Sequence, residues 1–296
     1  MPELPEVETV RRALEPRLQG RRFARVDQRR PDLRFPFPDD FVARLTGRTV
    51  ETLRRRAKYL LLALDSDEVL VIHLGMSGRM ILAGPDPDTK RQETANFHHQ
   101  AGRADSAIGE APHDHVVFDF DDGTRVVFND HRRFGLMDLV GQDQLETHKL
   151  FVGLGPEPLG NAFSHVYLND ALRAKQTPIK AALLDQRVVA GIGNIYACEA
   201  LHRSAISPKR LARTVPGVRA ARLAPAVKSV LEDAIAAGGS SLRDYVQTDG
   251  SLGYFQHAFA VYDREGKPCQ RPGCDGLIQR IVQSGRSTFY CGKCQR

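Results

Sequence analysis

Four of the five cysteines in this 296-residue chain lie within its last 28 residues, and they restrict its fold more than any other feature. Cys269 and Cys274 are separated by four residues, Cys291 and Cys294 by two, and sixteen residues lie between the pairs. Two such pairs suit a tetrahedral Zn²⁺ ion, each pair on a tight knuckle, with four unrelated thiols as the alternative. Because four thiolates leave no coordination position open, the predicted zinc is structural.

The segment that joins the knuckles, "GLIQRIVQSGRSTFYC", predicts a β-hairpin that turns at Ser284-Gly285. Arg286 at the hairpin tip is a candidate phosphate ligand, with simple solvation of an exposed arginine as the alternative. The last 36 residues carry seven Lys and Arg against three Asp and Glu, and the whole chain has a net charge of +6. This bias fits a polyanionic partner. The fifth cysteine, Cys198, is expected to be a small buried residue of a helix.

Length and composition place the chain among ordinary globular proteins. Its 296 residues suggest two domains, and 42% hydrophobic residues are enough for normal cores. No segment approaches the ~18 apolar residues that a membrane span requires, and the N-terminus lacks the layout of a secretory signal. We therefore expect a cytoplasmic protein without a membrane partner. In a reducing compartment, clustered cysteines indicate metal rather than disulfides.

The first half is predicted to be rich in strands behind one helix. Residues 5–19 place Val7, Val10, Leu14 and Leu18 on one helical face. Short β-branched runs predict strands at 59–64, 69–76, 115–120 and 125–130, and Asp122-Gly123 predicts a hairpin turn between the last two.

Polar stretches divide the rest of the chain. Residues 84–112 are polar and lack periodicity, which predicts a surface insertion. "GLGPEPL" at 153–159 reads as part of a linker. Residues 160–240 are rich in Ala, Leu and Arg at helical spacing, so a helical domain is predicted there.

Three glycine-bearing loops are candidate nucleic-acid contacts. "HLGMSGRM" presents Met76 between two glycines, and "NDHRRFGLMDL" places Phe134 beside two arginines. Such apolar side chains suit wedges between stacked bases, although a core methionine is an equal alternative for Met76 alone. In "VVAGIGNIYACEAL", Asn194 opens a helix behind a glycine turn, which suits phosphate binding, core packing or both.

The chain resembles bacterial formamidopyrimidine-DNA glycosylases along nearly its whole length. The motifs that carry the resemblance are "PELPEVETV", "RRAKYLLL", "HLGMSG", "HDHV", "RRFG", "LGPEPL", "GIGNIYACEAL", "DGSLGYFQ" and "RSTFYC", in this order. The resemblance implies an α+β multidomain fold. Its expected parts are an N-terminal β-sandwich with flanking helices at 2–145, a linker at 146–159, a helix-two-turn-helix domain with a lesion-capping loop at 160–260, and a β-hairpin zinc finger at 261–296.

The resemblance also implies an activity. It predicts a monomeric enzyme of base excision repair that removes oxidised purines, such as 8-oxoguanine and formamidopyrimidines, from double-stranded DNA and then nicks the abasic strand. One structural Zn²⁺ and no organic cofactor are implied. The alternatives are an endonuclease VIII-like glycosylase for oxidised pyrimidines, which the "PELPEVETV" start disfavours, and a non-catalytic homologue that binds damaged DNA.

The family's chemistry begins at the N-terminus. Removal of Met1 would free the secondary amine of Pro2. An α-amino group has a pKa of ~8 against ~10.4 for lysine, so a useful fraction is neutral and nucleophilic at cellular pH. Attack on the sugar C1′ would displace the base and give a Schiff base, which β- and δ-elimination then resolve. Glu3 matches the family's proton-transfer group.

Further roles carry over by motif. Lys58 matches a lysine linked to β-elimination, and Arg286 matches a finger arginine that grips phosphates and assists the δ-step. The matching DNA-binding positions are His73, Met76, His113, Arg132, Phe134, Lys175, Lys180 and Asn194, of which Met76, Arg132 and Phe134 fill the gap left by the flipped lesion. The matching base-pocket positions are Glu6, Glu199, Thr248 and Tyr254.

Several features depart from the family's pattern. The first knuckle has four intervening residues where the family usually has two, and the insertion at 84–112 is longer than usual. His131 stands directly before "RRFG". The basic position of the helical domain falls at Lys175 or its neighbour Gln176.

Overall fold

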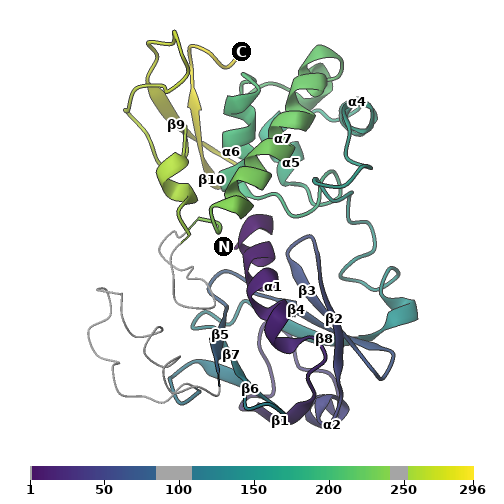
Figure 1. Ribbon diagram of the computed structural model, residues 1–296. Helices are drawn as coiled ribbons and strands as arrows, with labels where there is room; N and C mark the ends of the chain where they lie inside the picture. Colours follow the sequence, from purple (N-terminus) through teal and green to yellow (C-terminus); the bar gives the residue numbers. More distant parts are fainter. Residues whose placement is uncertain (1, 85–108, 241–252) are drawn as a thin grey trace. The chain divides into compact units, whose positions relative to one another are not determined.

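The computed structural model of the protein describes residues 2–84, 109–240 and 253–296. The chain divides into two compact units, one formed by 1–152 with 238–254 and the other by 153–237 with 255–296 (Figure 1). Most of the predicted insertion at 84–112, and Thr248, lie outside the described residues. The segment 238–254 groups with the first unit, whereas the domain limits expected from the resemblance assign it to the helical domain.

The first unit begins with α1 (Leu4–Leu18), as predicted. Glu3 is its N-cap residue, and a proline occupies the first turn, where its missing N–H removes no helical hydrogen bond. The side chains that share the predicted face, Val7, Val10, Leu14 and Leu18, are all buried in the core.

Two four-stranded antiparallel sheets follow, in the orders β1-β6-β7-β5 and β2-β3-β4-β8. Their strands are β1 (Phe23–Gln28), β2 (Val50–Arg56), β3 (Tyr59–Leu64), β4 (Glu68–His73), β5 (Arg79–Ala83), β6 (Asp114–Phe120), β7 (Arg125–Asn129) and β8 (Leu136–Gly141); the unit also holds α2 (Phe41–Leu45) and the 3₁₀ turn η1 (Gln142–Gln144). Apolar side chains from both sheets and from α1 form one core, as in a β-sandwich.

The sequence patterns located half of these strands. β3, β4, β6 and β7 coincide with predicted runs, and Gly123 turns the β6–β7 hairpin at a φ of 84°. The run at 69–76 ends early as a strand, at His73, because Gly75 adopts a φ of 65°. β2 was missed because its sequence, VETLRRR, has only two buried residues.

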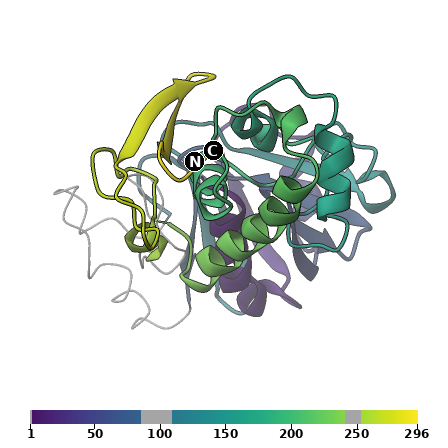
Figure 2. The same ribbon diagram turned by 90° about the horizontal axis from the view of Figure 1, so that it is seen from above.

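The second unit contains a helical part and a hairpin. Its elements are α4 (His165–Leu172), α5 (Ile179–Leu184), α6 (Asn194–Arg203), η2 (Ala212–Thr214), α7 (Val218–Ala236), η3 (Phe255–Ala258), β9 (Ile278–Gln283) and β10 (Arg286–Cys291). Figures 1 and 2 both show the β9–β10 hairpin beside α6. Ser284 and Gly285 form the two-residue turn of this hairpin with φ values of 49° and 70°, as the sequence predicts. The predicted fold class is confirmed.

No helix within the described ranges has both the length and the apolar composition of a membrane span.

Candidate active site and zinc centre

The N-terminus of the first unit is held by a buried carboxylate. Pro2, Glu3 and Glu6 are all buried. Glu6 Oε2 accepts a hydrogen bond from the backbone N–H of Glu3 at 2.8 Å, which fixes the residue that follows Pro2 at the start of α1. Glu6 Oε1 accepts from both the backbone N–H and the hydroxyl of Ser240, at 2.8 and 3.0 Å. One side chain therefore joins the N-terminus to the segment 238–240.

The described residues on either side of 241–252 lie together beside this carboxylate. Ser240 and Tyr254 form an isolated antiparallel bridge. A Cβ on Gly253 would lie 2.3 Å from the carbonyl oxygen of Gly239, so only glycine allows the two backbones to approach this closely. Tyr254, a predicted base-pocket residue, is 68% exposed. This geometry explains why 238–254 belongs to the first unit.

Lys58 and His73 lie at the ends of neighbouring strands. The two-residue turn between β2 and β3 contains Lys58, which is nevertheless buried. Desolvation, with a smaller contribution from the nearby cations Lys58 and Arg34, lowers the pKa of His73 to about 4. His73 Nδ1 accepts a hydrogen bond from the backbone N–H of Gly75 at 2.9 Å. A neutral His73 thus shapes the loop that carries Met76.

Asp130, which the sequence interpretation missed, connects the two predicted wedge loops. Its carboxylate is completely buried. Oδ1 accepts from the hydroxyl of Ser77 on the first loop, and Oδ2 accepts from the backbone N–H of Gly135 on the second, at 2.8 Å. The only available sequence signal was its place at the end of a strand, directly before "HRRFG".

The wedge candidates occupy the outer sides of these loops. Gly75 packs against the second loop, because a Cβ there would lie 2.4 Å from the backbone N of Gly135. Phe134 is 43% exposed, and the guanidinium carbon of Arg132 lies 4.9 Å from its ring centroid. Met76 is half-buried. The structure therefore brings the three residues of the predicted gap-filling set to two loops that share one buried anchor.

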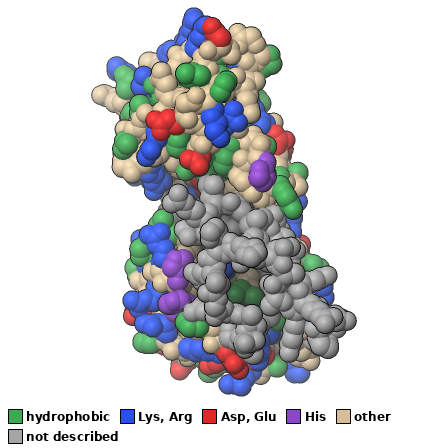
Figure 3. Space-filling view, turned by 90° about the vertical axis from the view of Figure 1, so that its left-hand side faces the viewer, with side chains coloured by type: hydrophobic (Ala, Val, Ile, Leu, Met, Phe, Trp, Pro, Cys, Tyr) green, Lys and Arg blue, Asp and Glu red, His purple; other side chains and the backbone are tan. Residues whose placement is uncertain are grey.

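His113 lies beside the second loop. It is exposed with a φ of 75°, and its carbonyl accepts from the backbone N–H of Asp130 at 3.0 Å. Its ring centroid lies 6.4 Å from that of His131, which is also exposed. Figure 3 shows neighbouring histidine side chains on the face of the first unit, with Lys and Arg side chains nearby. This surface suits an anionic partner.

A second set of predicted residues lies in the other unit, where helices contact the hairpin. Asn194 at the start of α6 donates from Nδ2 to the carbonyl of Ser287 at 2.9 Å. Lys180 is 1% exposed, and its ammonium donates to the Thr288 hydroxyl at 2.6 Å and the Ser287 carbonyl at 3.1 Å. Arg286 is exposed at the hairpin tip. Lys180 therefore orients the strand that begins at Arg286.

The remaining predicted positions of this unit also have structural partners. The Lys175 ammonium forms an ion pair with Asp185 at 3.3 Å. The Glu199 carboxylate is buried on α6 and accepts from the backbone N–H groups of 260–262 at 2.8 to 3.0 Å. Burial raises the pKa of Glu199, and these three donors oppose that shift. Glu199 thus anchors the start of the finger to α6.

The four finger cysteines form a zinc site. Their sulfur atoms all lie within 4.8 Å of one another, with Cys269 and Cys294 3.8 Å apart and Cys274 and Cys291 3.7 Å apart. A Cβ on Gly276 would lie 2.7 Å from Cys291 Sγ, so this glycine makes room for the knuckle. Four soft thiol ligands at this separation fit one tetrahedral Zn²⁺. The wide first knuckle does not prevent the cysteines from converging, and the predicted structural zinc is confirmed.

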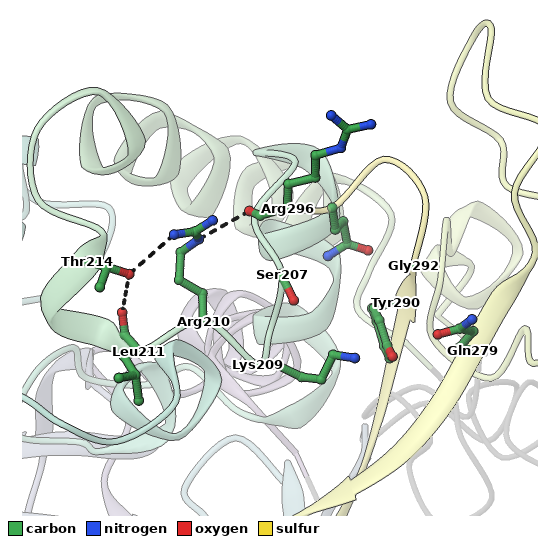
Figure 4. A pocket seen from close by; sticks show the side chains of 10 residues that line it. Ser207, Lys209, Arg210, Leu211, Thr214, Gln279, Tyr290, Gly292 and Arg296 are labelled. Atoms are coloured by element: carbon green, nitrogen blue, oxygen red, sulfur yellow. Dashed lines mark hydrogen bonds between the residues drawn. The ribbon is translucent and has the colours of Figure 1, made fainter.

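A cavity of about 590 Å³ lies in the second unit, and its lining includes Tyr290, Gly292 and Gln295, which adjoin the zinc ligands Cys291 and Cys294 in the chain (Figure 4). Its lining residues are Ser207, Lys209, Arg210, Leu211, Thr214, Gln279, Tyr290, Gly292, Gln295 and Arg296. Arg210 Nε donates to the Arg296 carbonyl at 3.3 Å, and the Lys209 ammonium lies 5.0 Å from the Tyr290 ring centroid. The cavity contains no predicted catalytic or DNA-binding residue, and its lining side chains join the 207–214 segment to the end of the chain.

The predicted residues thus form two groups. Pro2, Glu3, Glu6, Lys58 and the wedge loops belong to the first unit, and the zinc site with its supporting helices belongs to the second. The first group offers buried carboxylates beside an N-terminal proline, and the second offers an exposed guanidinium on a zinc-stabilised hairpin.

Family models match three successive parts of the chain. These are the formamidopyrimidine-DNA glycosylase N-terminal domain at 1–137, the formamidopyrimidine-DNA glycosylase H2TH domain at 154–246, and the zinc finger found in FPG and IleRS at 266–296. The chain is 56% identical over 296 residues to the formamidopyrimidine-DNA glycosylases of Ruegeria pomeroyi and Dinoroseobacter shibae, with 100% of each chain covered.

Solved structures give the same result. The MutM (FPG) protein from Thermus thermophilus is similar with a TM-score of 0.82 and 39% identity, over 99% of this chain and 98% of that one. A Lactococcus lactis Fpg in complex with abasic-site-containing DNA has a TM-score of 0.82 and 33% identity, over 99% of both chains. The resemblance drawn from the sequence motifs is confirmed. The chain therefore belongs to the formamidopyrimidine-DNA glycosylase family.

Proposed function

We propose that this protein is a bifunctional DNA glycosylase and abasic-site lyase that excises oxidised purines from duplex DNA, with Pro2 as the nucleophile. The observation that carries the proposal is the buried Glu3–Glu6 pair, which fixes the chain directly behind Pro2. Family membership supports the reaction class. Action on chromosomal DNA would place the protein in the cytoplasm, at the nucleoid.

The chemistry starts once Met1 has been removed. The neutral Pro2 nitrogen attacks the sugar C1′ as the glycosidic bond breaks, and the damaged base leaves with a proton. The Pro2 nitrogen then loses its proton, and the C1′–O4′ bond breaks as O4′ is protonated, which opens the sugar ring and gives an iminium ion at C1′. This iminium ion makes the C2′ proton acidic. Its loss expels the 3′ phosphate by β-elimination, and a second proton loss from the sugar expels the 5′ phosphate by δ-elimination. Pro2 suits this role because an α-amino group has a pKa of ~8, below that of a lysine.

Glu3 is the proposed proton-transfer group. It adjoins the nucleophile in sequence, and the hydrogen bond from its backbone to Glu6 holds it in place. Glu6 would contact the base pocket through the segment that it clamps at Ser240. Lys58 supplies positive charge for the β-elimination step. These assignments give Glu3, Glu6 and Lys58, three buried charged groups of the first unit, a role in the reaction or at the base pocket.

The wedge loops would occupy the gap that a flipped nucleotide leaves. Met76 and Phe134 replace lost stacking, and Arg132 contacts the orphaned base. Base flipping costs a few kcal/mol, less for a damaged base, which contributes to selectivity. His73 and His113 contact the strand near these loops. Arg286 grips a phosphate at the lesion, with Lys175 and Asn194 as further proposed DNA contacts. Lys180, which resembles a DNA-contacting position of the family, would act through the strand that begins at Arg286.

Borohydride trapping tests the nucleophile. Mass spectrometry first establishes that Met1 has been removed. Wild-type protein incubated with an 8-oxoguanine:C duplex and borohydride should then form a covalent protein–DNA adduct, and Pro2→Gly should form none. The matched control is Pro5→Ala, in the first turn of α1, which should still form the adduct. Absence of trapping by the processed wild type would favour a non-catalytic DNA-binding homologue.

Substrate class is tested separately. Duplexes that contain 8-oxoguanine:C or thymine glycol are compared under single-turnover conditions. The proposal requires faster release of 8-oxoguanine. Faster release of thymine glycol would assign the chain the pyrimidine-directed, endonuclease VIII-like activity instead.

A further inference from the structure

The C-terminal end of α6 contacts the first zinc knuckle through a buried histidine. His202 is 5% exposed, and its Nε2 lies 3.4 Å from Cys269 Sγ, within hydrogen-bonding distance of a sulfur acceptor. His202 belongs to the helical part of the second unit, whereas all four zinc ligands belong to the finger. It is therefore a side chain of α6 that offers a hydrogen bond to a zinc ligand, beside Cys198, which packs in the same cluster as Cys269 and Cys291.

Zinc binding decides the direction of this hydrogen bond. A zinc-bound cysteine is a thiolate and has no proton to donate. The hydrogen bond therefore requires the tautomer of His202 that carries its proton on Nε2. One Zn²⁺ with four thiolates has a net charge of −2, so an N–H group directed at a sulfur stabilises the loaded site. Because His202 is buried, water does not compete effectively for this donor.

The wide first knuckle supplies a second contact with the end of α6. Arg271, one of the four residues between Cys269 and Cys274, donates from its guanidinium to the carbonyls of His202 and Arg203. These carbonyls lie at the C-terminal end of α6, where a cation is favourable, and the His202 carbonyl also accepts from the backbone N–H of Ala205 at 3.0 Å. If only two residues separated Cys269 from Cys274, the knuckle would have fewer residues from which a side chain such as Arg271 could contact α6. The wide knuckle and the end of α6 are thus joined by two separate contacts.

We propose that His202 is a positioning residue of the zinc site. It donates a hydrogen bond from Nε2 to the Cys269 thiolate, is held there by Arg271, and slows the loss of zinc. The retention of zinc then depends on α6 as well as on the finger. Groups that hydrogen-bond metal ligands typically change metal affinity by about 10- to 100-fold when they are replaced.

The test measures zinc loss from the full-length protein. Zinc-loaded wild type, His202→Leu and His202→Gln are mixed with a chromogenic chelator well below their unfolding temperatures, and the rate of zinc transfer is recorded. His202→Leu removes the donor and should release zinc about tenfold faster or more. His202→Gln retains an N–H donor and should remain much closer to wild type. His165→Gln, at an exposed position of α4, is the matched control and should match wild type.

Arg271→Gln tests the second contact and should accelerate zinc release less than His202→Leu does. Equal rates for wild type and His202→Leu would overturn the proposal. Equal acceleration in the Leu and Gln variants would also overturn it, because packing rather than hydrogen bonding would then hold the metal. A wild-type rate for Arg271→Gln would remove Arg271 from the proposal.

A measurement on the wild type keeps the proposal testable if His202→Leu does not fold. The protein is loaded with ¹¹³Cd in place of zinc, and scalar coupling between the metal and the imidazole Nε2 proton is sought by NMR. Such coupling passes through an N–H···S–Cd hydrogen bond and should be present for His202. A spectrum that assigns the His202 proton to Nδ1 would contradict the proposal.

Discussion

Glu6 and Ser240 are 234 positions apart in sequence, and the Glu6 carboxylate joins them through two hydrogen bonds on a single oxygen. Its second oxygen holds the backbone of Glu3. The proposed nucleophilic end of the chain and the segment before 241–252 therefore share one buried acceptor.

Glu6→Gln should weaken the hydrogen bonds that hold Glu3 and Ser240. The carboxylate of Glu6 accepts from the backbone N–H of Glu3 with one oxygen and from that of Ser240 with the other. A glutamine has only one acceptor oxygen, so its NH₂ group would face one of these two N–H donors and leave it without an acceptor. A buried unsatisfied group costs about 1–3 kcal/mol, and we expect thermal unfolding at a lower temperature. Schiff-base formation, followed by borohydride trapping, should slow in parallel. Glu15→Gln on the exposed side of α1 should change stability by about 0.5 kcal/mol or less. Unchanged trapping in Glu6→Gln would separate Glu6 from catalysis.

Asp130→Asn should loosen the wedge loops without touching the nucleophile. The asparagine amide cannot accept from both Ser77 and Gly135, which we expect to cost about 1–3 kcal/mol of stability. A fluorescent base placed opposite an abasic-site analogue should report weaker insertion by the loops. Asp121→Asn, an exposed change at the end of β6, is the control. Normal insertion by Asp130→Asn would show that the loops keep their form without this anchor.

His73 should contribute a measurable pH dependence of stability. Its pKa in the folded protein is about 4, below the ordinary 6.5, so the unfolded chain takes up the proton first as the pH falls. Stability should therefore decrease between pH 6.5 and pH 4, by at most about 3 kcal/mol, and this group should contribute no pH dependence above that window. His73→Asn keeps an acceptor for Gly75 but does not titrate there. The free energy of unfolding in urea is measured for wild type and variant at pH 7 and pH 5. The stability advantage of the wild type over the variant should be smaller at pH 5 than at pH 7, and an equal advantage at both pH values would contradict the prediction.

Zinc removal should release the finger from α6. We expect about one zinc per chain in metal analysis, and loss of it in Cys294→Ser. Without zinc the four thiols lose their common ligand, and the finger should become susceptible to proteolysis while the first unit stays folded. Cys198→Ala removes a buried thiol that is not part of the ligand set and should keep its zinc. Retention of one zinc by Cys294→Ser would show that three cysteines suffice.

Arg286 and Lys180 should differ in the salt dependence of DNA binding. Arg286 is exposed, so Arg286→Gln should lower the slope of log Kd against log salt by about 1. Lys180 is buried against the hairpin, so Lys180→Gln should leave that slope unchanged and lower thermal stability instead. A lower slope for Lys180→Gln would support the direct DNA contact that the family resemblance implies.

Elements with a clear local sequence pattern were predicted correctly, whereas several strands and the partners of buried side chains were not. Helix α1 followed from the spacing of four apolar residues, and the β9–β10 turn followed from Ser284-Gly285. Strands β1 and β2 were missed because they have mixed polar sequences, FARVDQ and VETLRRR, whereas the apolar sequences of β5 (RMILA) and β8 (LMDLVG) lie directly behind the two glycine-bearing loops and were assigned to them. Lys180 was read as a DNA contact, and nothing local indicates that its ammonium is buried against Thr288.

The sequence by itself determined the family, helix α1, the β6–β7 and β9–β10 hairpins and the zinc ligands, because these depend on local motifs and spacings along the chain. Only the tertiary structure decided which distant groups meet. Glu6 with Ser240, Asp130 with two glycine loops, and His202 with Cys269 are all buried polar contacts. Their partners depend on how sheets and helices pack, and burial is what makes each of them costly to leave unsatisfied.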